Sequence, residues 1–473
     1  MKRTYLSLLV AGFTILQLGV GRVYAAPTQY AAVDLTDAQV ENIVRRSYQY
    51  VALYNINNKF AMDPGNPLST GGWNRVRANT TLADHTLKAI ARPNNDTLYV
   101  IAMLDLREEP VILEAPAFDS NYVSLMVTGY DHYVNIPMST RLGDFSEPSR
   151  ILFYTERTPG YAGEAVDGVD KIAEMSGDFV GAVYRVMPHA NEPERLQRNL
   201  DAMRAVKVMT LSEYRSGTAT EAGNPPEFAP YGQTDFDIFE NNLLEVMQFV
   251  FNHSTFDAND EIDQKLLAAY EPLGVAPGRA YDPSRVAEID GARFRAVAER
   301  IAPEELARAN DPEFLKDVTG LFQPKGRMTL ELLLFQSIIG PVGQPAAEAV
   351  YPPITTADGT PMNAINDYVI RMSPDEMPPA TAFWSATLYD TENGFFMPND
   401  HKKYSVGENA GMKLDEDGGI AIHIAAERPK GVPEENWLPL VRGDYGVDVI
   451  MRLYAPDLER FKTWTAPKAE RLN

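Results

Sequence analysis

The sequence contains no cysteine among its 473 residues and only six histidines. Without cysteine the chain can form no disulfide, no thiolate zinc site, no iron–sulfur cluster and no cysteine nucleophile. No histidine stands at metal-ligand spacing from another histidine, and such spacing is the usual sequence sign of a metal site. We therefore expect no metal site and no cofactor.

The chain is also poor in basic residues and in enzyme motifs. Lys and Arg number 43 against 65 Asp and Glu, which gives a formal net charge of −22. Nucleic acids and anionic membrane surfaces repel a polyanion that lacks a concentrated basic patch, so we expect no nucleic-acid partner. The chain has no nucleophile elbow, P-loop, dinucleotide-binding turn or H-E-x-x-H helix. Because 45% of the residues are hydrophobic, the chain is globular and long enough for several cores.

The longest apolar run lies at the N-terminus. Lys2 and Arg3 precede a hydrophobic stretch over 5–20, and small residues follow as far as Ala25. This order predicts a signal peptide over 1–25, cleaved near Ala25, and a periplasmic or secreted protein. An uncleaved anchor is the alternative, although the stretch is short for a bilayer core of about 30 Å. We expect no integral membrane segment after signal removal, because no later segment is apolar for long enough.

The residue pattern changes from β to α and back to β. An amphipathic helix over 34–57 comes first, and short apolar runs broken by turn residues then predict strands. We therefore predict an α+β, mainly β fold with two jelly-roll-like antiparallel β-sandwich regions and an intervening helical segment. The expected domains are an N-terminal helix and β-sandwich over 26–190, a helical segment over 191–345 and a C-terminal β-sandwich over 346–473.

The individual elements follow from the same patterns. The expected strands cover 98–106, 110–113, 122–130, 151–155 and 179–186 in the first β region, and 368–372, 382–389, 395–397, 420–425 and 447–454 in the second. Further helices are expected over 237–252, 260–273, 283–301, 312–321 and 329–339.

The two β regions share a short phrase. Residues 122–131 (YVSLMVTGYD) resemble residues 383–390 (FWSATLYD): each has an aromatic start, an early Ser, a strand and then Tyr-Asp. Duplication of a sandwich unit would explain the likeness. Coincidence would explain it too, because Tyr and Ser are frequent in strands and Asp is frequent where strands end.

A polar loop over 92–99 (RPNNDTLY) leads into the first long strand. Its Asn and Asp side chains can simply close turns on their own backbone. In the functional alternative, Arg92 clamps an anionic or carbonyl group while Asn94, Asn95 and Asp96 supply directional hydrogen bonds at a pocket mouth. Tyr99 would then line the same substrate site.

A second polar and aromatic cluster lies at Tyr130-Asp131-His132-Tyr133. Asp131 or His132 could act as an acid or base if folding brings it to the first cluster. Tyr130 and Tyr133 would then bind substrate beside it. The catalytic candidates are therefore Asp131, His132 and, from the first cluster, Asp96.

Large aromatic residues gather in the C-terminal β region. A platform for a sugar ring or an apolar ligand could be formed by Trp384, Tyr389, Trp437 and Tyr454. Large aromatics more often fill sandwich cores, so both interpretations stay open.

Residues 92–99, followed by Leu-Asp-Leu at 104–106, resemble the first of two domains of unknown function, numbered 1254 and 1214, that occur together in exported bacterial proteins. Phrases at 383–390, 403–407, 436–439 and 452–454 resemble the second. The resemblance implies export, a β-rich jelly-roll-like architecture with helices between the sandwiches, and an oligomer. It implies no catalytic residue.

One position departs from the pattern of the second domain. Lys403 stands where Arg is expected before the Tyr-Ser phrase. An anion clamp there would be weaker in geometry, because lysine lacks the bidentate fork of arginine.

These observations predict an exported protein that binds a small polar or amphipathic molecule in a cleft lined by Tyr, Asn, Arg and Asp. Hydrolysis in that cleft would use Asp96 or Asp131 as the general base, without a metal or with weak metal dependence. The alternative is a non-catalytic envelope or assembly protein that uses its β-sandwiches for oligomer or partner contacts. We expect a homo-oligomer in either case, and whether the chain is an enzyme stays open.

Overall fold

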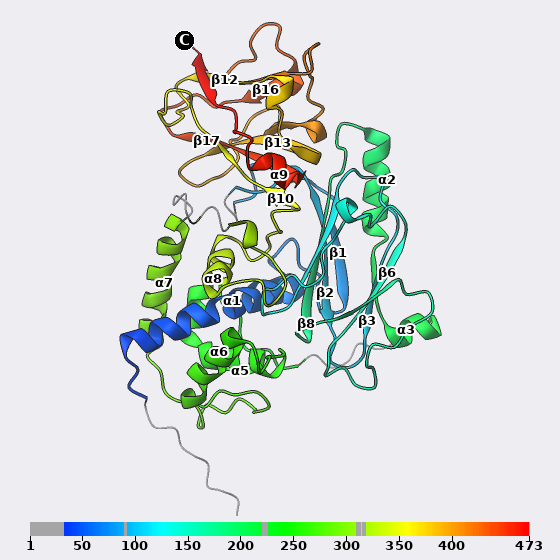
Figure 1. The fold of residues 1–473 in the computed structure, drawn as a ribbon, viewed down its shortest axis with the longest axis vertical. Helices are drawn as coiled ribbons and strands as arrows, with labels where there is room; N and C mark the ends of the chain where they lie inside the picture. Colours follow the sequence, from blue (N-terminus) through cyan, green and yellow to red (C-terminus); the bar gives the residue numbers. More distant parts are fainter. Residues whose placement is uncertain (1–32, 89–91, 220–225, 309–313, 315–317, 473) are drawn as a thin grey trace, which may run out of the picture.

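The computed structural model describes residues 33–88, 92–219, 226–308, 314 and 318–472. The predicted signal peptide lies outside the described residues, and so does half of the helix expected over 312–321. Figure 1 shows a C-terminal β region at the top, an N-terminal β region at the right and a group of helices at the lower left.

The N-terminal β region consists of two sheets packed face to face. One sheet has the strand order β1-β2-β8-β4-β5 and the other β7-β6-β3-β9. Alternate side chains of both sheets, such as Val100, Leu113 and Phe153, fill the core between them, as expected for strands buried on one face. The strands are β1 (Arg75–Asn79), β2 (Leu98–Asp105), β3 (Val111–Ala115), β4 (Val123–Thr128), β5 (Met138–Ser139), β6 (Ser149–Tyr154), β7 (Lys171–Glu174), β8 (Phe179–Val186) and β9 (Lys207–Thr210).

The C-terminal β region is a second sandwich. Its sheets have the orders β10-β17-β13-β14, with β11 also on β17, and β16-β15-β12-β18. Ile370, Ala386 and Met451 lie in the core between them. The strands are β10 (Ala349–Val350), β11 (Pro353–Ile354), β12 (Asp367–Met372), β13 (Ala380–Asp390), β14 (Ser405–Gly407), β15 (Ile420–Ala425), β16 (Trp437–Pro439), β17 (Val447–Pro456) and β18 (Ala469–Leu472).

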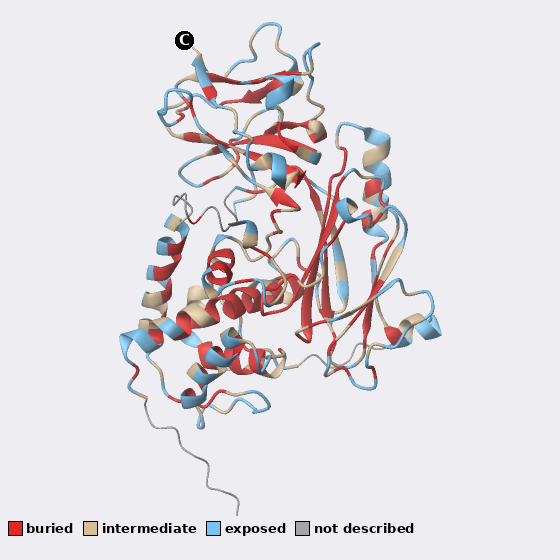
Figure 2. Ribbon diagram, viewed as in Figure 1, coloured by how far each residue is buried: buried red, intermediate tan, exposed pale blue. Residues whose placement is uncertain are grey.

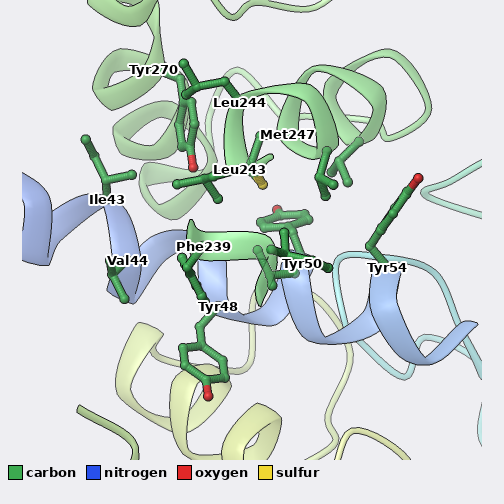
Figure 3. Close-up of a cluster of buried hydrophobic side chains, with 14 of the residues drawn as sticks. Ile43, Val44, Tyr48, Tyr50, Tyr54, Phe239, Leu243, Leu244, Met247 and Tyr270 are labelled. Atoms are coloured by element: carbon green, nitrogen blue, oxygen red, sulfur yellow. The ribbon is translucent and has the colours of Figure 1, made fainter. Parts of the chain in front are cut away.

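The helices pack around α1 (Asp37–Met62), which Figure 1 shows passing through the middle of the helical group. Thr36 and Gln39 form a capping box that satisfies free N–H groups at its start. Figure 3 shows Tyr50 and Tyr54 of α1 among side chains from the surrounding helices. The other helices of four or more residues are α2 (Pro193–Arg204), α3 (Leu211–Ser216), α4 (Asp235–Asn241), α5 (Leu243–Asn252), α6 (Glu261–Tyr270), α7 (Gly291–Ala307), α8 (Leu330–Ile339) and α9 (Leu458–Phe461).

The expected α+β fold, with antiparallel sandwiches and helices between them, is confirmed. Helices hold 29% of the chain and strands 24%, so the description as mainly β fits only loosely. Burial in Figure 2 follows the sheet faces and the helix contacts that build these cores. The division of the chain at 190 and 345 stays a prediction.

Several element boundaries differ from the sequence-based expectation. Residues 395–397 form no strand, and the helix expected from residue 283 begins at Gly291. That helix continues through Pro303 to Ala307. Asp290, whose side chain accepts from the Arg293 N–H, caps it, so the Asp282-Pro283 start signal belongs to a turn instead.

Strand alternation gives each sandwich an outer face that bears the residues discussed below. On β2, Val100 points into the N-terminal core, whereas Ile101 packs with α1 residues on the opposite side. On β17, Met451 lies in the C-terminal core, and Arg452 therefore points to the opposite face. No helix within the described ranges is both long and apolar enough to span a bilayer.

Candidate functional site at the seam between the two β regions

The loop that precedes β2 joins the two β regions. The Asp96 carboxylate Oδ2 accepts hydrogen bonds from the Ser385 hydroxyl (2.7 Å) and from the Tyr454 hydroxyl (3.1 Å). Asn94 donates to the Tyr454 hydroxyl oxygen at 3.0 Å, and its own Oδ1 accepts from the Asp96 N–H at 2.7 Å. One loop therefore closes its own turn and binds two strands of the other sandwich.

Arg452 of β17 lies beneath this loop. Its Nη2 donates to the carbonyl oxygens of Arg92 (3.0 Å) and Pro93 (3.4 Å), and the Tyr389 hydroxyl also donates to Pro93 (2.7 Å). The residue is only 4% exposed, yet its Nη1 has no hydrogen-bond partner among the described residues. A buried guanidinium group with an unused donor is costly unless something else binds it.

Arg185 of β8 is the corresponding arginine of the N-terminal region. It lies between Tyr99 of β2 and Ser124 of β4 in the strand register, and its guanidinium group stands 5.7 Å from the Tyr99 ring centroid. Its Nη2 donates to the Val342 carbonyl at 2.6 Å. Arg185 is 5% exposed, and its Nη1 also lacks a partner in the described part of the chain.

Tyr351, directly after β10, interacts electrostatically with both arginines. Although 48% of this residue is exposed, protein surrounds its hydroxyl and raises its pKa, while Arg185 and Arg452 both act in the opposite direction. Both arginines therefore act electrostatically on the same hydroxyl. We call Asp96, Tyr99, Arg185, Tyr351, Arg452 and Tyr454 the seam cluster.

The charge balance of the seam cluster is positive when Asp96 is ionised, because it holds two guanidinium groups and one carboxyl group. Burial raises the pKa of the Asp96 carboxyl, and Arg452 acts against this rise. The neighbouring Glu408 is also buried, which raises its pKa to about 7, and Asp96 contributes to the rise. Two carboxyl groups near the cluster thus bind protons more readily than usual.

The polar residues next to Arg185 have partners. The Tyr122 hydroxyl donates to Gln344 Oε1 at 3.0 Å, and Gln344 Nε2 donates to Ser124. Further along, Glu348 accepts from Ser139 at 2.9 Å and pairs with an arginine on the following turn. The donors without a partner among the described residues include Nη1 of both arginines and the hydroxyl of Thr387, two residues after Ser385 on β13.

The second predicted cluster lies elsewhere, against the helices. His132 is fully buried, and its Nδ1 and Nε2 lie within hydrogen-bond distance of Ser337 Oγ (2.8 Å) and the Pro341 carbonyl (2.9 Å). Burial lowers its pKa to about 3, so the ring is neutral. Both nitrogens are engaged within the protein, which leaves neither for proton transfer in this conformation.

Asp131 and its tyrosine neighbours are also buried there. Neither oxygen of the Asp131 carboxyl has a hydrogen-bond partner among the described residues, and burial raises its pKa. Tyr130 packs against Tyr54 of α1, and Tyr133 lies in an apolar cluster with α8 residues. Within the described ranges no hydrogen bond, ion pair or ring contact joins this cluster to Asp96.

The remaining predicted residues take different positions around the seam. The Arg92 guanidinium is half-exposed and pairs with Asp448 at 2.5 Å. The contact of Arg92 with the seam cluster is made by its backbone carbonyl oxygen, which accepts from Arg452. Asn95 donates to the Ala83 carbonyl at 2.5 Å and accepts from a serine of β14. Trp384 points into the C-terminal core. The catalytic and binding roles assigned to all of these residues stay predictions.

The sequence analysis missed Arg185 as a site residue and included Arg452 only in the family phrase at 452–454, whereas Tyr454 was also a candidate for the aromatic platform. Arg185 is the single charge in the apolar segment FVGAVYRV, and Arg452 is the single basic residue in VDVIMRLYAP, which also holds Asp448. Charged residues are almost never fully buried unless they are paired. This signal could have drawn attention to both positions.

Other features of the surface contain none of the predicted residues. A hollow of about 630 Å³ is lined in part by Glu109, Tyr161, Leu211 and Arg215, at the far side of the N-terminal sandwich from the seam. No group of three or more His, Asp or Glu side chains in the described part of the chain is arranged to hold a metal ion.

Fold and seam together define a class: an α+β protein of two β-sandwiches joined by helices, with a buried cationic cluster where the sandwiches meet. Residues 73–209 match a family described as a protein of unknown function (DUF1254), and residues 348–458 match another described as a protein of unknown function (DUF1214). The chain belongs to the proteins that pair these two domains. Asp96 and Arg185 lie in the first match, and Arg452 lies in the second.

One solved structure shows the same fold. The crystal structure of the VPA0106 protein from Vibrio parahaemolyticus aligns with a TM-score of 0.68 and 23% identity, covering 92% of this chain and 100% of that chain. An uncharacterized protein from Burkholderia cenocepacia aligns with a TM-score of 0.41 and 13% identity, over 92% of this chain and 93% of that chain. No curated protein matches the chain.

Proposed function

We propose that this protein binds a small polar or amphipathic molecule at the seam cluster. The observation that carries the proposal is that Arg185 and Arg452, 5% and 4% exposed, each keep a donor, Nη1, with no partner among the described residues. Buried polar groups are normally satisfied, and a bound molecule would supply the missing acceptors. The partly exposed rings of Tyr99 and Tyr351 supply apolar surface next to these donors.

Hydrolysis of the bound molecule is a second step that Asp96 could support. Its raised pKa makes the carboxylate a stronger base than an exposed aspartate. Ser385 and Tyr454 would hold the carboxylate in place through Oδ2. Export to the periplasm or medium and assembly into a homo-oligomer belong to the same proposal and rest on the sequence.

The competing function is a non-catalytic assembly or envelope role. It gains support from Asn94, Asn95 and Asp96, whose side chains mainly hold the loop and the two β regions together. A purely structural seam, however, does not account for two unused donors on buried arginines.

A thermal-shift screen tests the binding function. The protein is tested against sugars, aromatic acids, fatty acids and sulfate esters, because a ligand at 100 times its Kd adds about 2.7 kcal/mol of stability. Tyr351→Ala removes an exposed ring of the seam cluster, and Tyr281→Ala removes a comparably exposed tyrosine of the helical segment as the matched control.

We expect at least one compound to raise the melting temperature of the wild type and of Tyr281→Ala, and to do so much less with Tyr351→Ala. The proposal fails if no compound stabilises the protein. It also fails if every stabilising compound acts equally on both variants.

A further inference from the structure

Pairing with carboxylates is the rule for the partly buried arginines of this chain. Arg157 lies 2.9 Å from Asp178, Arg141 lies 3.0 Å from Glu348, and Arg45 lies 3.0 Å from Glu305. Such pairs offset much of the cost of removing a guanidinium group from water.

Arg185 and Arg452 break this rule although they are buried more deeply. Neither guanidinium group forms an ion pair with a carboxylate of the described residues, and each Nη1 has no hydrogen-bond partner among them. Asp96 acts on Arg452 from a greater distance, whereas only tyrosines act on Arg185. Arginine cannot release its proton to escape this situation.

Arg185 and Arg452 carry like charges on the faces of the two sandwiches that meet at Tyr122 and Tyr454, so they also repel each other. An anion between them would remove that repulsion and accept hydrogen bonds from both unused donors. Planar carboxylates and tetrahedral phosphate or sulfate groups carry several acceptor oxygens and match the arginine fork. A neutral ligand could accept the bonds but would leave the positive charge uncompensated.

We propose that the molecule bound at the seam cluster is an oxyanion, held between Arg185 and Arg452. The group is either a free inorganic oxyanion or a carboxylate, phosphate or sulfate on an organic ligand whose apolar part lies against Tyr99 and Tyr351. This inference rests on the proposed function and specifies its substrate class.

The test measures binding of sulfate, inorganic phosphate, benzoate and benzamide by thermal shift and calorimetry, with ionic strength held constant by sodium chloride. Benzoate and benzamide have nearly the same shape and differ in charge. The proteins are the wild type, Arg185→Gln, Arg452→Gln and the control Arg371→Gln, which changes an exposed arginine of β12.

We expect an oxyanion to stabilise the wild type and Arg371→Gln, and to bind each seam variant about tenfold or more weakly, because charge-assisted hydrogen bonds are lost. Benzamide should bind none of the four proteins measurably. Binding of sulfate or phosphate without benzoate would identify a free inorganic ligand. Binding of benzoate alone would identify the charged group of an organic ligand.

The inference is overturned if benzamide binds as well as benzoate, if no oxyanion binds, or if the two seam variants keep wild-type affinity. The proposed function survives these results when a neutral compound binds and its binding is lost in Tyr351→Ala. It fails together with the inference when no binding of any kind depends on the seam cluster.

Ligand-free stability provides a second, independent measurement. An arginine kept for binding leaves an uncompensated charge in the free protein, so Arg185→Gln should melt at the same temperature as the wild type or higher. If the arginine instead stabilises the fold, the variant that lacks it should have a lower melting temperature than the wild type. A clearly lower melting temperature for both seam variants, together with absent oxyanion binding in the wild type, would assign the arginines to the fold.

Discussion

Ser385 lies directly opposite Arg452 across strands β13 and β17. In the other β region, Ser124 lies opposite Arg185 across β4 and β8 in the same way. Each pair lies on the outer face of its sandwich, so a serine–arginine pair from each domain faces the seam. The two domains thus contribute matching halves to one cluster.

The two segments that contain these serines, 122–131 and 383–390, are also in direct contact. The rings of Tyr122 and Phe383, which begin the two phrases, have centroids 5.9 Å apart at 63°. Phe383 in turn stacks on Tyr454 with centroids 4.1 Å apart. In both β regions the serine of the phrase pairs with an arginine that lies outside the phrase. This shared partner is independent of the sequence likeness, and it favours structural duplication over coincidence.

Replacing Tyr454 with Phe tests the hydrogen bonds of the seam. The variant loses the bond to Asp96 and the bond from Asn94, so we expect the free energy of unfolding to fall by about 1–3 kcal/mol. Tyr184→Phe is the matched control, because the buried Tyr184 hydroxyl has no partner among the described residues. Urea unfolding should show little or no loss for the control, and equal losses for both variants would contradict the assigned bonds.

Replacing Glu408 with Gln tests the buried carboxyl group beside Asp96. The folded pKa of about 7 lies above the usual value of 4.5, so folded Glu408 binds a proton between these values and the unfolded chain does not. The stability from this group is therefore present below pH 4.5 and is lost as the pH rises through 7, by about 3 kcal/mol in total.

Glu408→Gln, which stays neutral, should match the wild type at pH 5 and exceed it in stability at pH 8. Urea unfolding at the two pH values measures this difference. A constant difference between variant and wild type would show that Glu408 titrates normally.

His132→Gln should change the pH dependence in the opposite sense. The folded pKa of His132 is lowered to about 3 from 6.5, so the unfolded chain binds a proton between these values and the folded protein does not. Stability from this group is present above pH 6.5 and is lost on acidification, by about 2 kcal/mol at pH 5. The free energy of unfolding of the variant should therefore be much lower than that of the wild type at pH 8. At pH 5 the difference should be smaller by about 2 kcal/mol.

The fold and the seam loop were predictable because local signals specify them. Capping residues at Thr36, turn residues before β2 and apolar alternation act over a few positions. The segment over 92–99 was therefore identified correctly as a polar loop that leads into a strand. Local signals also misplaced the start of α7, because two Asp-containing start signals compete within ten residues there.

The partners across the seam could not be predicted from the sequence. Arg185 and Arg452 are 267 positions apart (452 − 185), and only sandwich packing brings both to Tyr351. Periodicity shows that Trp384 and Ser385 point to opposite faces, but it does not show which face is the core. The prediction therefore left both a binding platform and the core open for Trp384, and the structure places its side chain among core residues.

A second buried network allows a test of what holds the helices to the N-terminal sandwich. Asp178 Oδ2 lies 2.9 Å from His253 Nδ1 at the end of α5, and its Oδ1 accepts from Arg157 at 2.9 Å. Burial alone would raise the pKa of Asp178, but the bonds from His253 and Arg157 outweigh it and lower the pKa.

Asp178→Asn should lower the free energy of unfolding by about 2–3 kcal/mol at pH 7, because two charge-assisted hydrogen bonds weaken. Asp119→Asn is the control: Asp119 is 44% exposed beside two arginines, so its loss should cost less than about 1 kcal/mol. The Asp178 contribution is present above the usual pKa of 3.8 and is lost as the pH falls through the lowered folded value. Variant and wild type should therefore converge in stability under acid conditions, and a difference that persists there would show that packing, not ionisation, explains the effect of the substitution.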